Sequence, residues 1–254
     1  MNAADLLYSQ GFGTRRHCIA LVEEGFFAIN TLHGTENVEG IELEIYKDPY
    51  SPLSGELEGF IYSVEKIQWT YQSSAYVMLN KPMGIECSQK PSNWPSVYTL
   101  LPSPLRQRPR KGSTPGVQAV GRLDQDTTGL LLLSDDGQFI HKMSSPRHHV
   151  PKIYEVTTED PLDQRVCEKL IAGVQLKDEY ELILAHQAEL TGEFTIKLTL
   201  TQGKYHQVKR MLAATGHKVI KLHRSQIGNL RIPDDLYEGE WRWLSKKQID
   251  DLFV

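Results

Sequence analysis

Two carboxylates stand two residues apart in a short polar segment. Asp124 and Asp126 lie in the run GRLDQDTTG, residues 121–129, which follows an apolar stretch and precedes the leucines of residues 130–133. A short apolar run bounded by turn residues is typical of a buried strand. Asp124 is therefore expected in a loop between two core strands. A carboxylate held there needs a partner, because an isolated buried charge is costly.

Simpler interpretations of this loop come from motifs of other classes. The segment matches the first half of a calcium-binding loop, but Leu132 and Asp135 stand where a polar ligand and a bidentate glutamate belong. It also resembles the phosphatase DxDxT motif, yet a glycine and an arginine interrupt the apolar strand that should precede it. An Asx-turn, in which the Asp124 side chain accepts from nearby amides, stays open. We expect no metal here.

Composition places the chain among globular proteins without a membrane segment. It has 254 residues, 40% of them hydrophobic, and no apolar run of 18 residues or secretory signal. One large domain or two smaller ones would fit this length. The three cysteines, Cys18, Cys87 and Cys167, lack CxxC spacing. That pattern argues against a disulfide framework or zinc site and favours the reducing cytoplasm.

The charge is distributed unevenly although its sum is only −4. Acidic residues gather at 36–65, and basic ones at 106–112, 146–152, 203–210 and 217–224. A single cluster of this kind is most often a solvated surface. Several basic clusters, three of them with interleaved histidine or tyrosine, favour an RNA partner.

Residues 1–65 are predicted to form a separate small module. Helical periodicity at 3–10 is followed by a second helix that Thr14 can cap, and then by strand patterns at 26–30 and 41–46. Helix, turn, helix and strand, with Arg15 and Arg16 at the start of the second helix, resemble the S4 RNA-binding domain. The resemblance implies RNA contacts by these two arginines. A helical cap on the main domain is the alternative. We expect a linker at 66–74 and a main domain at 75–254.

The main domain is predicted to alternate strands and helices. A strand should end at Lys81-Pro82, and residues 103–116 should form a loop. A helix over 160–176 would start at Asp160-Pro161 and end at Gly173. The remaining expected elements are strands at 153–158, 185–200 and 218–232, a helix closing at Gly216, and a terminal helix with a Ser245–Gln248 capping box.

Four motifs keep their order along the main domain. They are GRLDQDTTGLLLLSDDG, SPRHH, KxY and GKYHQVKRM. Together they resemble the RNA pseudouridine synthases, and within them the ribosomal small-subunit pseudouridine synthase A group. The resemblance implies an α+β fold with a mixed, largely antiparallel central sheet flanked by helices. It also implies that the protein isomerises a uridine of ribosomal RNA, in particular of 16S rRNA, to pseudouridine without a cofactor.

The resemblance also implies roles for individual residues. Asp124 corresponds to the family's nucleophile, either at C1′ or through a glycal route, and Arg210 to the cation that keeps it ionised. Tyr154 would stack on the flipped base and help to remove the C5 proton. Taken alone, a tyrosine on a strand face is more often core. Candidate RNA contacts are Arg122, Arg147, His148, Lys152, Lys204, His206, Gln207 and Lys209.

Other functions remain open at this point. A large-subunit rRNA synthase of the same family, or a non-catalytic ribosome-assembly factor on the same fold, would carry similar motifs. A magnesium-dependent phosphotransferase using Asp124 is a remote third. We expect a monomer that binds ribosomal RNA, naked or in an assembling small subunit, and no membrane.

Overall fold

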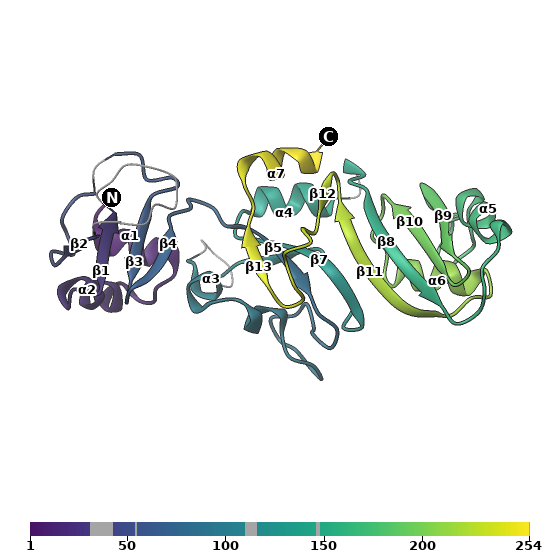
Figure 1. Cartoon of the computed structure of the whole chain (residues 1–254), viewed down its shortest axis with the longest axis horizontal. Coiled ribbons are helices and arrows are strands. Elements are labelled where there is room, and N and C mark those ends of the chain that lie inside the picture. Colours follow the sequence, from purple (N-terminus) through teal and green to yellow (C-terminus); the bar gives the residue numbers. More distant parts are fainter. Residues whose placement is uncertain (31–42, 54, 110–115, 146–147, 254) are drawn as a thin grey trace. The chain divides into compact units, whose positions relative to one another are not determined.

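The computed structural model describes residues 1–30, 43–53, 55–109, 116–145 and 148–253 (Figure 1). The chain forms two compact units. The N-terminal unit comprises Met1–Ala75 and Leu101–Gln118, and the C-terminal unit comprises Tyr76–Leu100 and Ala119–Val254. Among the described helices, none combines the length and apolar character that crossing a bilayer requires.

The N-terminal unit pairs two short helices with a four-stranded antiparallel sheet. Thr14 caps the second helix, its Oγ1 accepting from the His17 amide at 3.3 Å, as its sequence predicts. Leu6, Leu7, Phe27 and Tyr62 are almost fully buried between helices and sheet. Within residues 1–75 the elements are α1 (Ala3–Gln10), α2 (Arg15–Glu23), β1 (Phe27–Asn30), β2 (Leu43–Tyr46), β3 (Ile61–Val64) and β4 (Ile67–Thr70), in sheet order β2-β1-β3-β4.

Two expectations about this part of the chain differ from the structure. Residues 66–74 are not a linker throughout, because Ile67–Thr70 is β4 of the N-terminal sheet. The loop expected at 103–116 begins with helix α3 (Ser103–Gln107), and residues 110–115 lie outside the described chain. Arg108 is only 2% exposed and donates to Gln10 Oε1 at 2.9 Å and to the Gln72 carbonyl at 2.7 Å. These distant partners are invisible in the local pattern.

The C-terminal unit is built on a mixed sheet. Along its path β13-β5-β7-β11-β8-β10-β9, every neighbouring pair is antiparallel except β7 and β11, which run parallel. Two short strands, β6 (Gln118–Val120) and β12 (Leu230–Arg231), pair with β7 and β11. The path strands are β5 (Tyr76–Lys81), β7 (Thr127–Ser134), β8 (Lys152–Thr158), β9 (Gln187–Gly192), β10 (Thr195–Leu200), β11 (Val219–Ile227) and β13 (Trp241–Trp243).

Strand β7 forms the centre of this unit. Leu130–Leu133 are fully buried, and since successive side chains of a strand point to opposite faces, both faces are covered there. Helices α4 (Gly137–Ser144) and α7 (Lys246–Asp250) lie by the β5–β7 part of the sheet, and α5 (Gln164–Ala172) and α6 (Gln207–Ala214) by the other part (Figure 1). Among the described residues, 3₁₀ turns at Val97–Leu100 and Asp251–Phe253 also belong to this unit. The predicted α+β class with a largely antiparallel sheet is confirmed.

Helix boundaries show where local signals decide and where they do not. The Ser245–Gln248 capping box and the glycine end of α5 are present as predicted. The start of α5 is three residues later than expected, because the Asp163 side chain, not Asp160, accepts from the Val166 amide. Both aspartates satisfy the sequence rule for a cap, and the hydrogen bond distinguishes them.

Candidate active site

The carboxylate of Asp124 lies in the loop between β6 and β7 and is held by two side chains from α6 and the residue before it. Lys209 Nζ is 3.1 Å from Oδ2, and His206 Nε2 is 3.2 Å from Oδ1. The Thr127 amide bonds to the Asp124 main-chain oxygen at 3.1 Å rather than to its side chain. The Asx-turn interpretation is therefore wrong, and both carboxylate oxygens point to partners on another element.

Lys209 bridges two carboxylates. Its Nζ is also 2.6 Å from Asp126 Oδ1. Burial by itself would lower the pKa of Lys209, but hydrogen bonds to Asp126 and Asp124 outweigh it and raise that pKa above its usual value. Lys209 is thus a full positive charge at neutral pH. The spacing of the two aspartates is explained by one shared ammonium group.

A buried lysine holds the Asp124 loop through hydrogen bonds to its main-chain carbonyls. Lys81, at the end of β5, is 0% exposed, and its Nζ donates to the carbonyls of Pro82 and Thr127 at 2.9 Å and of Gln125 at 3.3 Å. Burial lowers the pKa of Lys81. The sequence predicted only the end of a strand at this lysine. The available signal was a cation ending an otherwise apolar strand, where a buried charge must find acceptors.

Tyr154 forms the aromatic wall next to Asp124. It is 9% exposed on β8, directly opposite Arg224 of β11, and it shares its face of the strand with Lys152. A small cavity of about 70 Å³ lies between Tyr154 and Asp124, with Leu200, Val208 and Leu222 in its apolar lining. A carboxylate, an aromatic ring and an apolar wall suit a flat, uncharged ring next to a site of nucleophilic attack.

Arg210 does not occupy the position expected for it. Its Nη1 donates to the Tyr205 carbonyl at 3.2 Å, its Nη2 to the Lys177 carbonyl, and it lies 3.8 Å from Glu179. Successive helical residues point about 100° apart, so only one of two neighbours can face Asp124. In the structure that residue is Lys209, and the predicted ion pair between Asp124 and Arg210 is wrong.

Several predicted RNA contacts surround the Asp124 cavity. Arg122 is exposed and lines it, and Lys204 lines it while pairing with Glu179 at 2.5 Å. His206 has a left-handed backbone, with φ of 47°, and its ring stacks on Tyr205 at 3.8 Å between centroids. Gln207 is only 5% exposed, and its Oε1 accepts from the Lys204 amide at 3.0 Å, so its amide group faces the protein.

The other predicted RNA contacts lie away from the Asp124 cavity or outside the described residues. His148 is exposed but lines neither this cavity nor its neighbours. Arg147 lies outside the described residues. Arg15 and Arg16 are exposed on α2 of the N-terminal unit, where Arg15 pairs with Asp5 and lies 4.3 Å from the centroid of the Tyr8 ring.

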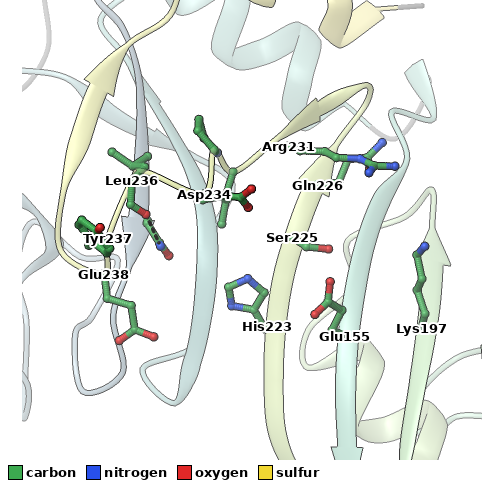
Figure 2. A pocket seen from close by; sticks show the side chains of 13 residues that line it. Glu155, Lys197, His223, Ser225, Gln226, Arg231, Asp234, Leu236, Tyr237 and Glu238 are labelled. Carbon is green, nitrogen blue, oxygen red and sulfur yellow. Dashed lines mark hydrogen bonds between the residues drawn. The ribbon is translucent and has the colours of Figure 1, made fainter. Parts of the chain in front are cut away.

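A second cavity of about 490 Å³ opens on the opposite face of the same sheet (Figure 2). Glu155 follows Tyr154 on β8 and therefore points away from it. Figure 2 shows Glu155, Lys197 and His223 side by side on β8, β10 and β11, across from the segment that carries Asp234. None of the candidate site residues predicted from the sequence lies in the lining of this cavity. Across the described chain, no group of three His, Cys, Asp or Glu side chains could hold a metal ion.

The sequence and the fold of this chain are both similar to those of known proteins. Residues 75–214 match the family described as RNA pseudouridylate synthase. Two relatives named ribosomal small subunit pseudouridine synthase A are similar: that of Haemophilus influenzae is 38% identical over 82% of this chain and 86% of its own, and that of Escherichia coli K12 is 42% identical over 68% and 72%. A crystal structure of a pseudouridylate synthase superposes with a TM-score of 0.65, at 33% identity over 99% of both chains. The matched residues include Asp124, Tyr154 and Lys209, and the chain belongs to the RNA pseudouridylate synthase family.

Proposed function

We propose that this protein converts one uridine of small-subunit (16S) ribosomal RNA to pseudouridine, with Asp124 as the nucleophile. The observation that supports this most directly is the Asp124 carboxylate, held between Lys209 and His206 beside Tyr154. The names of the similar relatives support the choice of small-subunit RNA. We expect a monomer that works in the cytoplasm, where ribosomes assemble.

The reaction requires an ionised carboxylate from the protein. It requires no second substrate. Asp124 attacks C1′ while the N1–C1′ bond breaks, and the bonding electrons go to uracil N1. The base turns, C5 bonds to C1′, and Asp124 leaves. The proton on C5 is lost and N1 gains one, so that atoms and electrons balance. The glycal route, in which Asp124 removes the 2′ proton, makes the same demand for an ionised side chain.

The surroundings of Asp124 suit these steps. Lys209 places a positive charge 3.1 Å from Asp124 Oδ2 and orients the carboxylate. Tyr154 offers a ring on which a flipped base can stack, a contact worth about 1–3 kcal/mol in single-strand binders. That gain offsets part of the few kcal/mol that flipping costs. Arg210 would act by positioning Tyr205 and the 177–179 segment rather than by touching the substrate.

The test is to incubate the protein with protein-free small-subunit rRNA and map new pseudouridines. We expect one site, and none with Asp124→Asn, whose RNA affinity should stay close to that of the native chain because the side-chain shape is kept. Pseudouridine from the Asp124→Asn variant would contradict the assigned nucleophile. Modification of large-subunit RNA alone would favour the related large-subunit function, and tight binding with no product on any rRNA would favour an assembly factor.

We also propose that the N-terminal unit is an S4-like module that binds the same RNA. Its two helices, the Thr14 cap and the exposed Arg16 on α2 support this role. Arg16 has no ion-pair partner among the described residues, whereas Arg15 pairs with Asp5, so Arg16→Gln removes an unpaired charge. We expect Arg16→Gln to weaken RNA binding and leave the turnover at saturating RNA unchanged. Unchanged affinity would refute a role for this residue.

A further inference from the structure

A larger cavity adjoins the one at Asp124. It measures about 520 Å³ and shares Arg122, Tyr154 and residues 202–204 with its neighbour. Among the described residues that line it, every charged side chain is a cation: Arg122, Lys152, Lys204 and Arg224. Lys204 is already paired with Glu179. A concave site with this lining attracts an anion.

Arg224 is the least explained of these cations. It is 3% exposed on β11, directly opposite Tyr154, and its Nε donates to the Leu130 carbonyl at 2.8 Å. Its Nη2 is buried and has no hydrogen-bond partner in the described part of the chain. A buried guanidinium without a counter-charge is costly, so a ligand that supplies oxygen acceptors would be favoured. The register of β11 shifts just after Arg224, and such irregularities often re-aim side chains at sites.

Lys152 lies beside it on the same face. Lys152 and Tyr154 are two residues apart on β8, and Lys152 Nζ donates to the Val150 carbonyl at 2.9 Å. Burial and, secondly, the charge of Arg224 lower the pKa of Lys152 to about 8. The groups facing it are Arg224 on β11, Tyr154 on its own strand, and Arg122 and Lys204 on the loops that complete the cavity. None supplies a negative charge.

We propose that this cavity is a phosphate site, in which Lys152 and Arg224 bind a phosphodiester group of the substrate RNA. The inference rests on the proposed function and adds to it. Arginine donates to phosphate oxygens from a fixed planar fork, and lysine adds a point charge. Because the site shares the Tyr154 wall with the Asp124 cavity, the bound phosphate belongs to a nucleotide adjacent to the target uridine. Holding it would fix the strand while the base is flipped.

The experiment is a phosphate scan of the modified rRNA fragment. In each substrate one phosphodiester near the target uridine is replaced by a neutral methylphosphonate, and kcat/KM is measured for the native chain and for Lys152→Met. With the native chain, one position should lower kcat/KM by about ten- to a hundredfold, the range for hydrogen bonds to charged groups. With Lys152→Met the loss at that position should shrink several-fold, since the charge partner is already gone.

Lys197→Met is the matched control. Lys197 belongs to the neighbouring strand β10, lines the cavity on the opposite face (Figure 2), and should leave the whole scan unchanged. Arg224→Lys tests the second ligand, with thermal melting as a check that the variant folds. Pseudouridine formation without any position coupled to Lys152 would overturn the phosphate site and leave the proposed function intact. Inorganic phosphate competing equally with all substrates, with no position-specific loss, would show a free-anion site and overturn it too.

Discussion

Replacement of Lys209 by methionine is expected to slow pseudouridine formation about thirtyfold. The change removes the ammonium 3.1 Å from Asp124 Oδ2 and keeps a chain of similar length and helix propensity. The Asp124 carboxylate would keep its contact with His206 but lose the hydrogen bond and the positive charge that hold it in place. The matched change at the next residue, Arg210→Met, should lower the rate by less than about threefold, because Arg210 pairs with Glu179 and with carbonyls at a partly exposed site.

The magnitude follows from the distance and the exposure. Two unit charges 3.1 Å apart interact by about 1.3 kcal/mol in water and by about 5 kcal/mol at an effective dielectric constant of 20. The side chains of Lys209 and Asp124 are 24% and 30% exposed, so solvent screens part of the interaction. A value of about 2 kcal/mol, in the lower part of this range, corresponds to about thirtyfold in rate.

The assay is single-turnover pseudouridine formation on saturating small-subunit rRNA, so that changes in affinity do not enter. Lys209→Arg keeps the charge and should recover most of the lost rate. Thermal melting of each variant shows whether the fold is retained. If Lys209→Met reacts at the native rate, or if a folded Arg210→Met loses as much as Lys209→Met, the assignment of Lys209 as the partner of Asp124 fails.

Three further changes test the frame around the site. Lys81→Met leaves carbonyls that Lys81 binds without a donor and should lower the free energy of unfolding by about 3 kcal/mol in urea titrations. Gly129→Ala would place a Cβ 2.3 Å from the Arg224 carbonyl at a φ of 107°, and should lower the urea midpoint far more than Gly121→Ala, whose Cβ meets open space. As the pH rises through about 8, Lys152 loses its proton, so kcat/KM at low RNA concentration should fall, and this fall should vanish in Lys152→Met.

Local signals predicted most elements of the fold. The four leucines of β7, the Thr14 cap and the Ser245–Gln248 box each depend on residues within a few positions of one another. Helix α3 and the buried Arg108 were missed for the opposite reason. Arg108 is satisfied by Gln10 and by the Gln72 carbonyl, more than thirty residues away in sequence, and a local reading of its Pro- and Arg-rich surroundings indicates a loop.

The motifs that form the site could be predicted from the sequence, but the side chain of α6 that faces Asp124 could not. The family resemblance implies roles for Asp124 and Tyr154, and the two residues line one cavity in the structure. The choice between Lys209 and Arg210 depends on the rotational phase of α6. That phase is set by where the helix starts. The helix starts after His206, whose backbone is left-handed, and a histidine in the sequence does not by itself predict this conformation.

The parallel pair of β7 and β11 explains why these groups meet. Because β7 and β11 run in the same direction, with Thr127 opposite Leu222, the segments that precede both strands arrive at the same end of the sheet. The Asp124 loop precedes β7, and α6 with Lys209 precedes β11. Antiparallel β8 then pairs with β11 and brings Tyr154 opposite Arg224. An antiparallel β7–β11 pair would send α6 to the far end, and Asp124 would face no cation from it.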